Sequence, residues 1–409
     1  MGQSRSRSLP VTSKLSVRQE NDRIKYAVSS MQGWRPYMED AHAAILDLHD
    51  SKSTSFFAVY DGHAGANVAL YCASQFHIEL MHHEDYHNNL AHAVERTFFR
   101  IDEQLQQLDG WREAFKPPLV KAFNLLNCLK PPACDKGTPD TEGSTACVVL
   151  IRGNQIIVGN VGNSRCVLSR DGQAIDLSTD HKPTLAAERE RIVKAGGKIS
   201  RSKLPKMLLG VIVGTRLGVH RVNGILAVSR SIGSFQLKRN KDLTPEEQMV
   251  TCSPDIMTVD ITDDTEFLVI ASDGLWDYVS SQGAVDFVHK QLNSGIRDLR
   301  FICELLIDIC MRTQDNMTMI LVQFKHAPRV PPPASDVHVV PPPAGNVPVV
   351  DPAFIPSSST NPIPAISAGG AGAKARADTC VTEITEVKEE EDKGSSGGAT
   401  EEESLLPLS

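Results

Sequence analysis

The chain has 409 residues, a formal net charge of -8 and an aromatic content of 5%. This length supplies a sizeable core for one large domain or two ordinary ones. The acidic balance argues against a nucleic-acid-binding protein, which needs a basic face. No apolar run approaches the ~18 residues of a membrane span. The nine cysteines form no C-x-x-C pair and are an odd number, which is typical of free thiols in a reducing compartment. We therefore expect a protein without a membrane span in the cytoplasm, the nucleus or both.

Residues 1–22 are polar and carry several basic side chains, which predicts a flexible leader. The first six residues, Met1-Gly-Gln-Ser-Arg-Ser6, match the N-myristoylation pattern, in which Gly2 accepts the acyl chain after removal of Met1. One acyl chain beside a few basic residues gives reversible membrane association. The alternative is an unmodified leader.

Residues 23–325 are predicted to form one globular domain. Short runs rich in Val, Ile, Phe and Thr predict strands, over 24–30, 43–48, 55–60, 146–151, 155–161, 166–169, 224–228, 267–271 and 317–324. Apolar residues at helical spacing predict helices, over 67–80, 91–107, 119–127, 185–195, 282–292 and 298–311. Most strands follow one another directly while helices are grouped, and this order favours an α+β layered fold over a doubly wound parallel sheet.

The composition changes in residues 326–409. This segment contains 13 of the 24 prolines and twelve Asp and Glu against five Lys and Arg. Such a sequence buries too little apolar surface to offset the entropy of ordering, so a disordered, Pro-rich and acidic tail is predicted. Its proline triplets are interpreted as an extended spacer or, alternatively, as ligands for an aromatic-lined groove.

Acidic residues stand where four of the predicted strands begin or end. In chain order they are Glu39 with Asp40, Asp61, Asp273 and Asp315. Asp-Gly and Asp-Asn pairs are also ordinary turn formers. However, a buried, unpaired carboxylate is costly, and four such sites in one domain would converge on one edge if the strands are neighbours. Only cations would then hold the acids together, and all-oxygen ligands suit Mg²⁺ or Mn²⁺ rather than zinc.

A series of motifs extends this pattern along the domain. The series is Arg35-Pro-Tyr-Met-Glu39-Asp40, Val59-Tyr-Asp61-Gly62-His63-Ala-Gly65, Gly143-Ser-Thr-Ala146, Ala227-Val-Ser-Arg230, Ala271-Ser-Asp273-Gly274 and Asp315-Asn316-Met-Thr318. In order and approximate spacing it resembles the metal-dependent serine/threonine protein phosphatases of the type 2C, or PPM, family, and plant members most of all. The resemblance covers about residues 23–325. It implies a central β-sandwich of two antiparallel sheets flanked by α-helix pairs, with a binuclear metal centre at one end.

The resemblance also implies roles for individual residues. The implied ligands of two Mg²⁺ or Mn²⁺ ions are the bridging Asp61, Glu39, the Gly62 carbonyl, Asp273 and Asp315, with Asp40 acting through bound water. Two such cations polarise a phosphoryl group and lower the pKa of a bridging water. Arg35 is implied to bind the substrate phosphate, because a guanidinium fork matches phosphate in a bidentate manner. His63 is implied to protonate the leaving alkoxide.

Three features depart from the family pattern. Asn163 replaces an Asp that usually helps to hold a third, weaker metal, so occupancy of that site is doubtful. Ser234 stands where an Asp usually follows Gly233. The run 207–213 is unusually apolar, in a region where the family has a variable flap, and the loop before Asp315 is short.

These observations predict a monomeric Mg²⁺- or Mn²⁺-dependent phosphatase that acts on phosphoserine and phosphothreonine in proteins. Two alternatives remain open. One is a binuclear phosphohydrolase for small phosphate esters. The other is a catalytically weak or inactive module of the same fold that binds phosphoproteins. Asn163 and Ser234 favour the binding module, whereas the complete acid set favours the enzyme.

Overall fold

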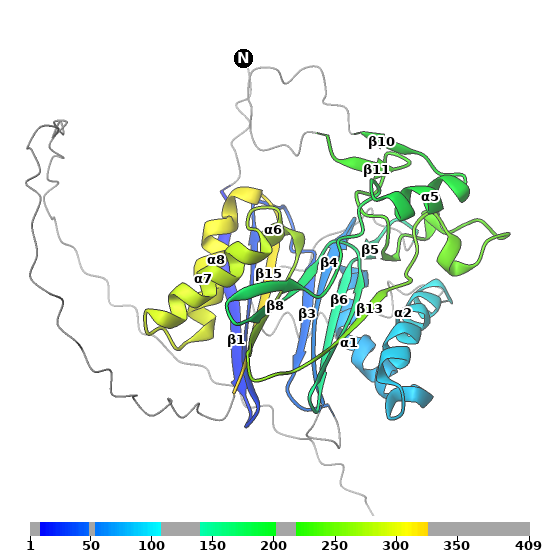
Figure 1. Ribbon diagram of the computed structural model, residues 1–409. Helices are drawn as coiled ribbons and strands as arrows, with labels where there is room; N and C mark the ends of the chain where they lie inside the picture. The colour runs from blue at the N-terminus through cyan, green and yellow to red at the C-terminus, as the bar shows by residue number, and fades with distance from the viewer. Residues whose placement is uncertain (1–8, 49–53, 108–139, 202–217, 326–409) are drawn as a thin grey trace, which may run out of the picture. The chain divides into compact units, whose positions relative to one another are not determined.

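The computed structural model describes residues 9–48, 54–107, 140–201 and 218–325. Within these ranges, two antiparallel sheets lie between two groups of helices (Figure 1). Gly2, the helix predicted over 119–127, the apolar run 207–213 and the predicted tail 326–409 lie outside the described residues. None of the described helices combines the length and the apolar character needed to cross a bilayer.

The first sheet has six strands in the order β1-β2-β15-β14-β8-β9. Their bounds are Val11–Glu20, Ile24–Gly33, Met317–Phe324, Thr265–Ala271, Arg165–Arg170 and Gln173–Asp176. The second sheet follows the order β12-β5-β4-β6-β7-β13, and β3 pairs with β4 beside this path. These strands span Ile232–Gly233, Gly143–Ser144, Thr54–His63, Ala146–Arg152, Gln155–Val161, Asp255–Asp260 and, for β3, Asp40–Ile45. A separate hairpin joins β10 (Ile199–Arg201) to β11 (His220–Val222).

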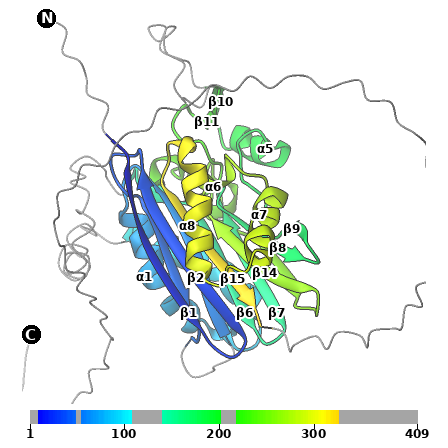
Figure 2. The same cartoon turned by 90° about the vertical axis from the view of Figure 1, so that its left-hand side faces the viewer.

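Helices cover the outer face of each sheet. The second sheet packs against α1 (Asn67–Met81) and α2 (Leu90–Gln107). The first packs against α6 (Asp273–Trp276), α7 (Ser281–Asn293) and α8 (Leu299–Cys310), and Figure 2 shows α7 and α8 lying across its strands. A further helix, α5 (Ala186–Lys194), lies near the β10–β11 hairpin.

Strand β4 shows why the chain forms layers. Phe56 and Tyr60 face the core shared with α1 and α2, whereas Phe57 and Val59 face the core between the two sheets. Successive side chains of a strand point to opposite faces, so an apolar run without alternation is buried on both sides. Tyr26 of β2 meets Phe57 across the sandwich with ring centroids 5.2 Å apart. The predicted α+β sandwich with flanking helices is confirmed.

The predicted leader is wrong in its second half. Residues Val11–Glu20 form β1, which pairs with β2 at the edge of the first sheet. Polar residues alternate there with Leu15 and Val17, and this is the pattern of a half-exposed edge strand. Ion pairs add to the pairing, since the Lys14 ammonium lies 2.6 Å from Asp308 of α8.

The strand predicted over 224–228 is also wrong. Asn223 and Gly224 both have positive φ, which produces a tight turn after β11. Within residues 224–228, the strand-like pairing is limited to an isolated bridge between Leu226 and Val222. Apolar composition alone therefore predicted a strand where the backbone reverses.

A buried ion cluster fixes α5 to the segment that follows β11. Glu188 is 3% exposed and accepts hydrogen bonds from Arg230 at 2.8 and 3.0 Å. Arg191 lies 2.9 Å from its other carboxylate oxygen. Burial alone would raise the pKa of Glu188, but Arg230 and Arg191 outweigh it and lower the pKa to about 2.

This lowered pKa predicts an acid-sensitive contribution to folding. The unfolded pKa of Glu is about 4.3, so the contribution is fully present above that pH and is lost between about pH 4 and pH 2, at an order of about 3 kcal/mol. In urea titrations from pH 7 to 3, Glu188→Gln should therefore have a lower free energy of unfolding than the unmodified chain at neutral pH. The gap between the two free energies should narrow below pH 4. Glu190→Gln, on the exposed side of the same helix, is the control and should match the unmodified chain. A gap that stays constant down to pH 3 would contradict the assignment.

Candidate active site

The strand register brings the predicted acids to one end of the sandwich. Asp40 lies directly opposite Asp61 in the β3–β4 pair. Asp273 follows the end of β14, and Asp315 precedes the start of β15. These two strands are antiparallel neighbours, so the end of one lies beside the start of the other. Strand pairing therefore brings the acids together two by two, one pair at the end of each sheet.

Hydrogen bonds hold the acids in place at this end, two of them between the sheets and the third within the second sheet. The hydroxyl of Ser272 donates to an Asp40 carboxylate oxygen at 2.8 Å. The backbone N–H of Glu39 donates to the side-chain oxygen of Asn316 at 2.8 Å. The backbone N–H of Asp61 donates to the Thr145 hydroxyl at 3.1 Å. Each contact fixes the backbone or side chain of an acid that the sequence singled out.

The acids lie within reach of one another's charge. Burial raises the pKa of Asp61 well above its usual range, and Asp273 is the largest of the neighbouring charges that add to this shift. Burial also raises the pKa of Asp40 to about 7, with smaller contributions from Asp315 and Asp273. The pKa of Glu39 is raised by burial as well. Such a set is stabilised by any bound cation, because a cation favours the ionised form of every member.

Two of these carboxylates are directed to neighbouring donors. The guanidinium of Arg35 donates to the two oxygens of Asp315 at 2.6 and 3.1 Å. The amide of Asn163 donates to a carboxylate oxygen of Asp273 at 2.8 Å. Arg35 is therefore a bidentate ligand of an anion, and Asn163 lies against a predicted metal ligand.

His63 is the last residue of β4, and its imidazole contacts a serine rather than one of the acids described above. Its Nε2 is 2.8 Å from the hydroxyl of Ser234. Burial lowers the pKa of His63 to about 4, and the charges of Lys238 and Arg221 add to this effect. The imidazole is therefore neutral at pH 7 in this environment.

The donor set fits a hard divalent cation. Carboxylates, with the backbone carbonyl of Gly62 beside Asp61 in β4, are the ligands that Mg²⁺ and Mn²⁺ prefer. Within the described ranges, no group of three or more His, Cys, Asp or Glu side chains forms a ready-made metal cage. The charges of Asp273 and Asp315 nevertheless add to the raised pKa values of Asp61 and Asp40, so these acids share one electrostatic environment.

Sequence reasoning missed two supporting side chains. Ser272 and Asn316 hold Asp40 and Glu39 in place. Both are adjacent to predicted ligands, Ser272 before Asp273 and Asn316 after Asp315. Their position in the motifs was the available signal, but their partners are more than two hundred residues away in the chain and could not be read from it.

The chain matches the family model described as Protein phosphatase 2C over residues 24–317. It is 54% identical over 325 residues to "Probable protein phosphatase 2C 16" of Oryza sativa subsp. japonica, covering 78% of this chain and 62% of that protein. It is 50% identical over 327 residues to "Probable protein phosphatase 2C 21" of the same organism, covering 80% of this chain and 90% of the relative. The chain thus spans less than two thirds of the first of these relatives.

Among solved structures, the fold is similar to the crystal structure of serine-threonine phosphatase 2C from Toxoplasma gondii. The TM-score is 0.57 at 20% identity, and the match covers 76% of this chain and 99% of that one. At this level of identity the likeness concerns the fold.

A tight backbone approach holds Asp273 against the start of β15, and this predicts an effect of Gly274. A Cβ added at Gly274 would overlap the backbone oxygen of Asn316. Gly274→Ala should therefore destabilise the fold by about 1–3 kcal/mol in urea unfolding, even though alanine favours helices. Gly283→Ala is the matched control, because the nearest neighbours of an added Cβ at this helical glycine are side-chain atoms at 3.1 Å, which can move more easily than a backbone oxygen. Equal stability of the two variants would show that the predicted overlap is absent.

Proposed function

Because this chain belongs to the protein phosphatase 2C family, we propose that it hydrolyses phosphoserine and phosphothreonine in proteins at a Mg²⁺- or Mn²⁺-dependent centre. The observation that carries the proposal is the group of acids at one end of the sandwich, where burial and, to a smaller extent, neighbouring carboxylates raise the pKa of Asp40 and of Asp61. A protein gains nothing in stability from such a group by itself, so a bound cation is the simplest reason for it.

We assign the binding of two ions to the strand-end acids. Asp61 would serve both ions, Glu39 and the Gly62 carbonyl would help to hold one of them, and Asp273 and Asp315 would help to hold the other. Asp40, which is held by Ser272, acts through water. When bound, two divalent ions supply Lewis-acid polarisation of the phosphoryl group and activate water near neutral pH.

Arg35 is proposed to bind the phosphate of the substrate. Its two donors already meet both oxygens of one carboxylate, that of Asp315, and the same fork matches two phosphate oxygens. A bound phosphate would therefore compete with the Asp315 carboxylate for the guanidinium of Arg35.

His63 is proposed to provide the proton for the leaving group. A serine or threonine alkoxide is a poor leaving group, so proton transfer accelerates its departure. Burial keeps the imidazole neutral, whereas the negative charge of a bound phosphate favours the protonated ring. The proton would thus be taken up when substrate is present.

Asn163 favours a second candidate, a phosphoprotein-binding module with little turnover. Its neutral amide occupies a donor position beside Asp273, where a carboxylate would attract a further cation. The retained acids and Arg35 argue for turnover. The two candidates differ in whether a phosphopeptide is hydrolysed or only bound when metal is supplied.

Removal of the central acid tests the metal centre. Asp61→Ala should abolish hydrolysis of a phosphoserine peptide, because it removes the proposed ligand of both ions. It should also diminish the rise in Tm that Mn²⁺ causes in the full-length chain. Asp47→Ala, in the exposed turn after β3, is the control and should retain both properties. Undiminished activity of Asp61→Ala in EDTA would refute the metal-dependent mechanism.

Restoring an acid at Asn163 tests the proposed third site. Without metal, Asn163→Asp places a second carboxylate against Asp273 and should lower the Tm, since the amide donor at 2.8 Å is replaced by a like charge. With Mn²⁺, the rise in Tm should be larger than in the unmodified chain, and half-maximal activity should require less metal. Asn163→Ala controls for loss of the amide without added charge. Superimposable metal titrations of the Asp variant and the unmodified chain would rule out a cation site here, and an inactive chain rescued by Asn163→Asp would favour the binding module.

A further inference from the structure

We propose that Ser234 is a positioning residue for His63, whose imidazole it holds in the orientation needed to protonate the leaving group. The inference rests on the proposed function and adds to it a residue that lies 171 positions from His63 in the chain. The direct observation is the 2.8 Å contact between the Ser234 hydroxyl and Nε2 of His63. A ring that is hydrogen-bonded through one nitrogen presents the other in a fixed direction.

The backbone of Ser234 is itself tightly held. Ser234 is 2% exposed and adopts a left-handed conformation with φ 54° and ψ 42°. This conformation is uncommon for a residue other than glycine, and it persists only where the surroundings determine it. One such constraint is the backbone N–H of Ser234, which donates to the Glu142 carbonyl at 2.7 Å.

Gly143 allows the hydroxyl and the imidazole to meet. This residue forms the short strand β5 between β4 and β12. A Cβ added at Gly143 would collide with both the Ser234 hydroxyl and Nε2 of His63. A side chain at this position would therefore separate the pair, so the close approach depends on the glycine.

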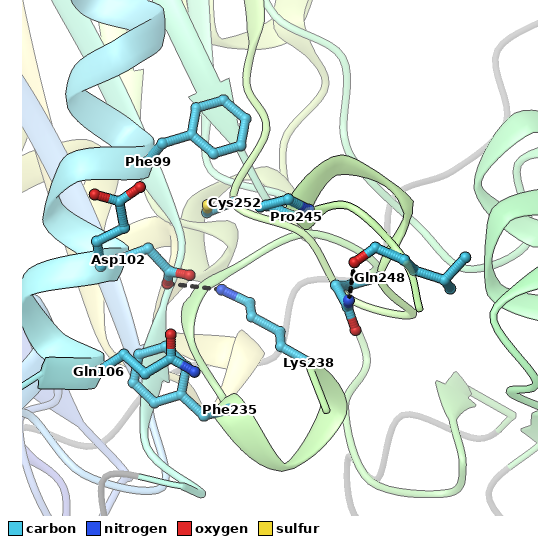
Figure 3. Close-up of a pocket in the computed structure, with 10 residues that line it drawn as sticks. Phe99, Asp102, Gln106, Phe235, Lys238, Pro245, Gln248 and Cys252 are labelled. Carbon is cyan, nitrogen blue, oxygen red and sulfur yellow. Dashed lines mark hydrogen bonds and ion pairs between the residues drawn. The ribbon is translucent and has the colours of Figure 1, made fainter. Parts of the chain in front are cut away.

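A largely buried ion pair anchors the segment that carries Ser234. One carboxylate oxygen of Asp102, in α2, accepts hydrogen bonds from the Gly233 N–H and the Lys238 ammonium, both at 2.7 Å. Lys238 also donates to the Ser231 carbonyl at 2.8 Å. Figure 3 shows Lys238 and Asp102 meeting on the wall of a cavity of about 200 Å³. Ser234 is thus fixed from both sides to a long helix.

The competing explanation is that Ser234 serves only to satisfy a buried polar ring. Such a role would affect stability, and it would affect all substrates alike. A positioning role instead affects the step that needs a proton. The leaving group separates the two, because p-nitrophenolate departs without protonation whereas a serine alkoxide does not.

The experiment compares both substrates in the full-length, Mn²⁺-loaded protein. Ser234→Ala should lower kcat for a phosphoserine peptide by about tenfold, with KM nearly unchanged, because one orienting hydrogen bond is lost. Its kcat for p-nitrophenyl phosphate should change by less than about twofold. Ser234→Gly removes the same hydroxyl while tolerating positive φ, and it replaces the alanine variant if that variant folds poorly.

Ser231→Ala is the matched control. Ser231 is a buried serine of the same segment, but its hydroxyl lies 3.5 Å from Nε2 of His63 and donates to the Ile232 carbonyl at 2.8 Å. It should show no difference between the two substrates. The reference is His63→Ala, which should lower kcat for the peptide much more than kcat for p-nitrophenyl phosphate. If His63→Ala behaves in this way but Ser234→Ala lowers kcat equally for both substrates, the positioning role is overturned.

A second readout does not depend on turnover. In the metal-free protein, the ¹⁵N resonances of the His63 ring should shift in Ser234→Ala and shift much less in Ser231→Ala, whose hydroxyl lies farther from Nε2, at 3.5 Å. If His63→Ala slows both substrates equally, the acid role of His63 fails, and with it the catalytic meaning of the contact. Unchanged His63 resonances in Ser234→Ala would overturn the contact itself.

Discussion

The burial of several carboxylates close to one another is the constraint on which the site depends. Asp61 and Asp40 lie opposite each other on paired strands, and burial raises the pKa of both. A fold tolerates this arrangement only if donors or cations compensate the charge. Arg35 and Asn163 supply part of that compensation on the neighbouring acids Asp315 and Asp273, through hydrogen bonds of 2.6 to 3.1 Å. The rest is the basis for assigning a divalent metal centre, since a cation acts on every member of the group at once.

The sandwich tolerates this concentration of charge because its apolar cores, which stabilise the fold, lie away from the strand ends that carry the acids. Its central core joins the inner faces of both sheets, and two further apolar cores lie beneath the helices. These three cores are built from the middles of strands and the faces of helices, whereas the acids stand at or near strand ends. The acids therefore leave the pairing in the middle of the strands intact. Ser272 links the two sheets at this end with one hydroxyl. The hydroxyl accepts a hydrogen bond from the backbone N–H of Thr318 and donates one to the Asp40 carboxylate.

Much of the fold and the acid set could be predicted from local sequence, and the failures have physical causes. Strands buried on both faces, such as β4, form unbroken apolar runs that need no tertiary information. The edge strand β1 has the composition of a leader, because its stability comes from pairing with β2 and from the ion pair of its Lys14 with Asp308 of α8. Short β5 and β12 carry no periodicity at two residues each. Their effect lies in long-range contacts such as that between His63 and Ser234, which no spacing rule encodes.

Asn163 and Ser234 have the same electrostatic effect on the site, because each is neutral where a carboxylate would add negative charge. Each is a neutral hydrogen-bonding side chain against a charged or chargeable group, Asp273 in one case and His63 in the other. A carboxylate at either position would add negative charge to an end of the sandwich that already holds several buried acids. The neutral side chains limit repulsion in the absence of cations, but they also weaken the attraction for a further cation and for a proton on the imidazole. The chain thus has the acids proposed to bind two ions, but less negative charge around them than carboxylates at these two positions would give. Its distinctive chemistry therefore lies in the residues next to the proposed ligands rather than in the ligands themselves.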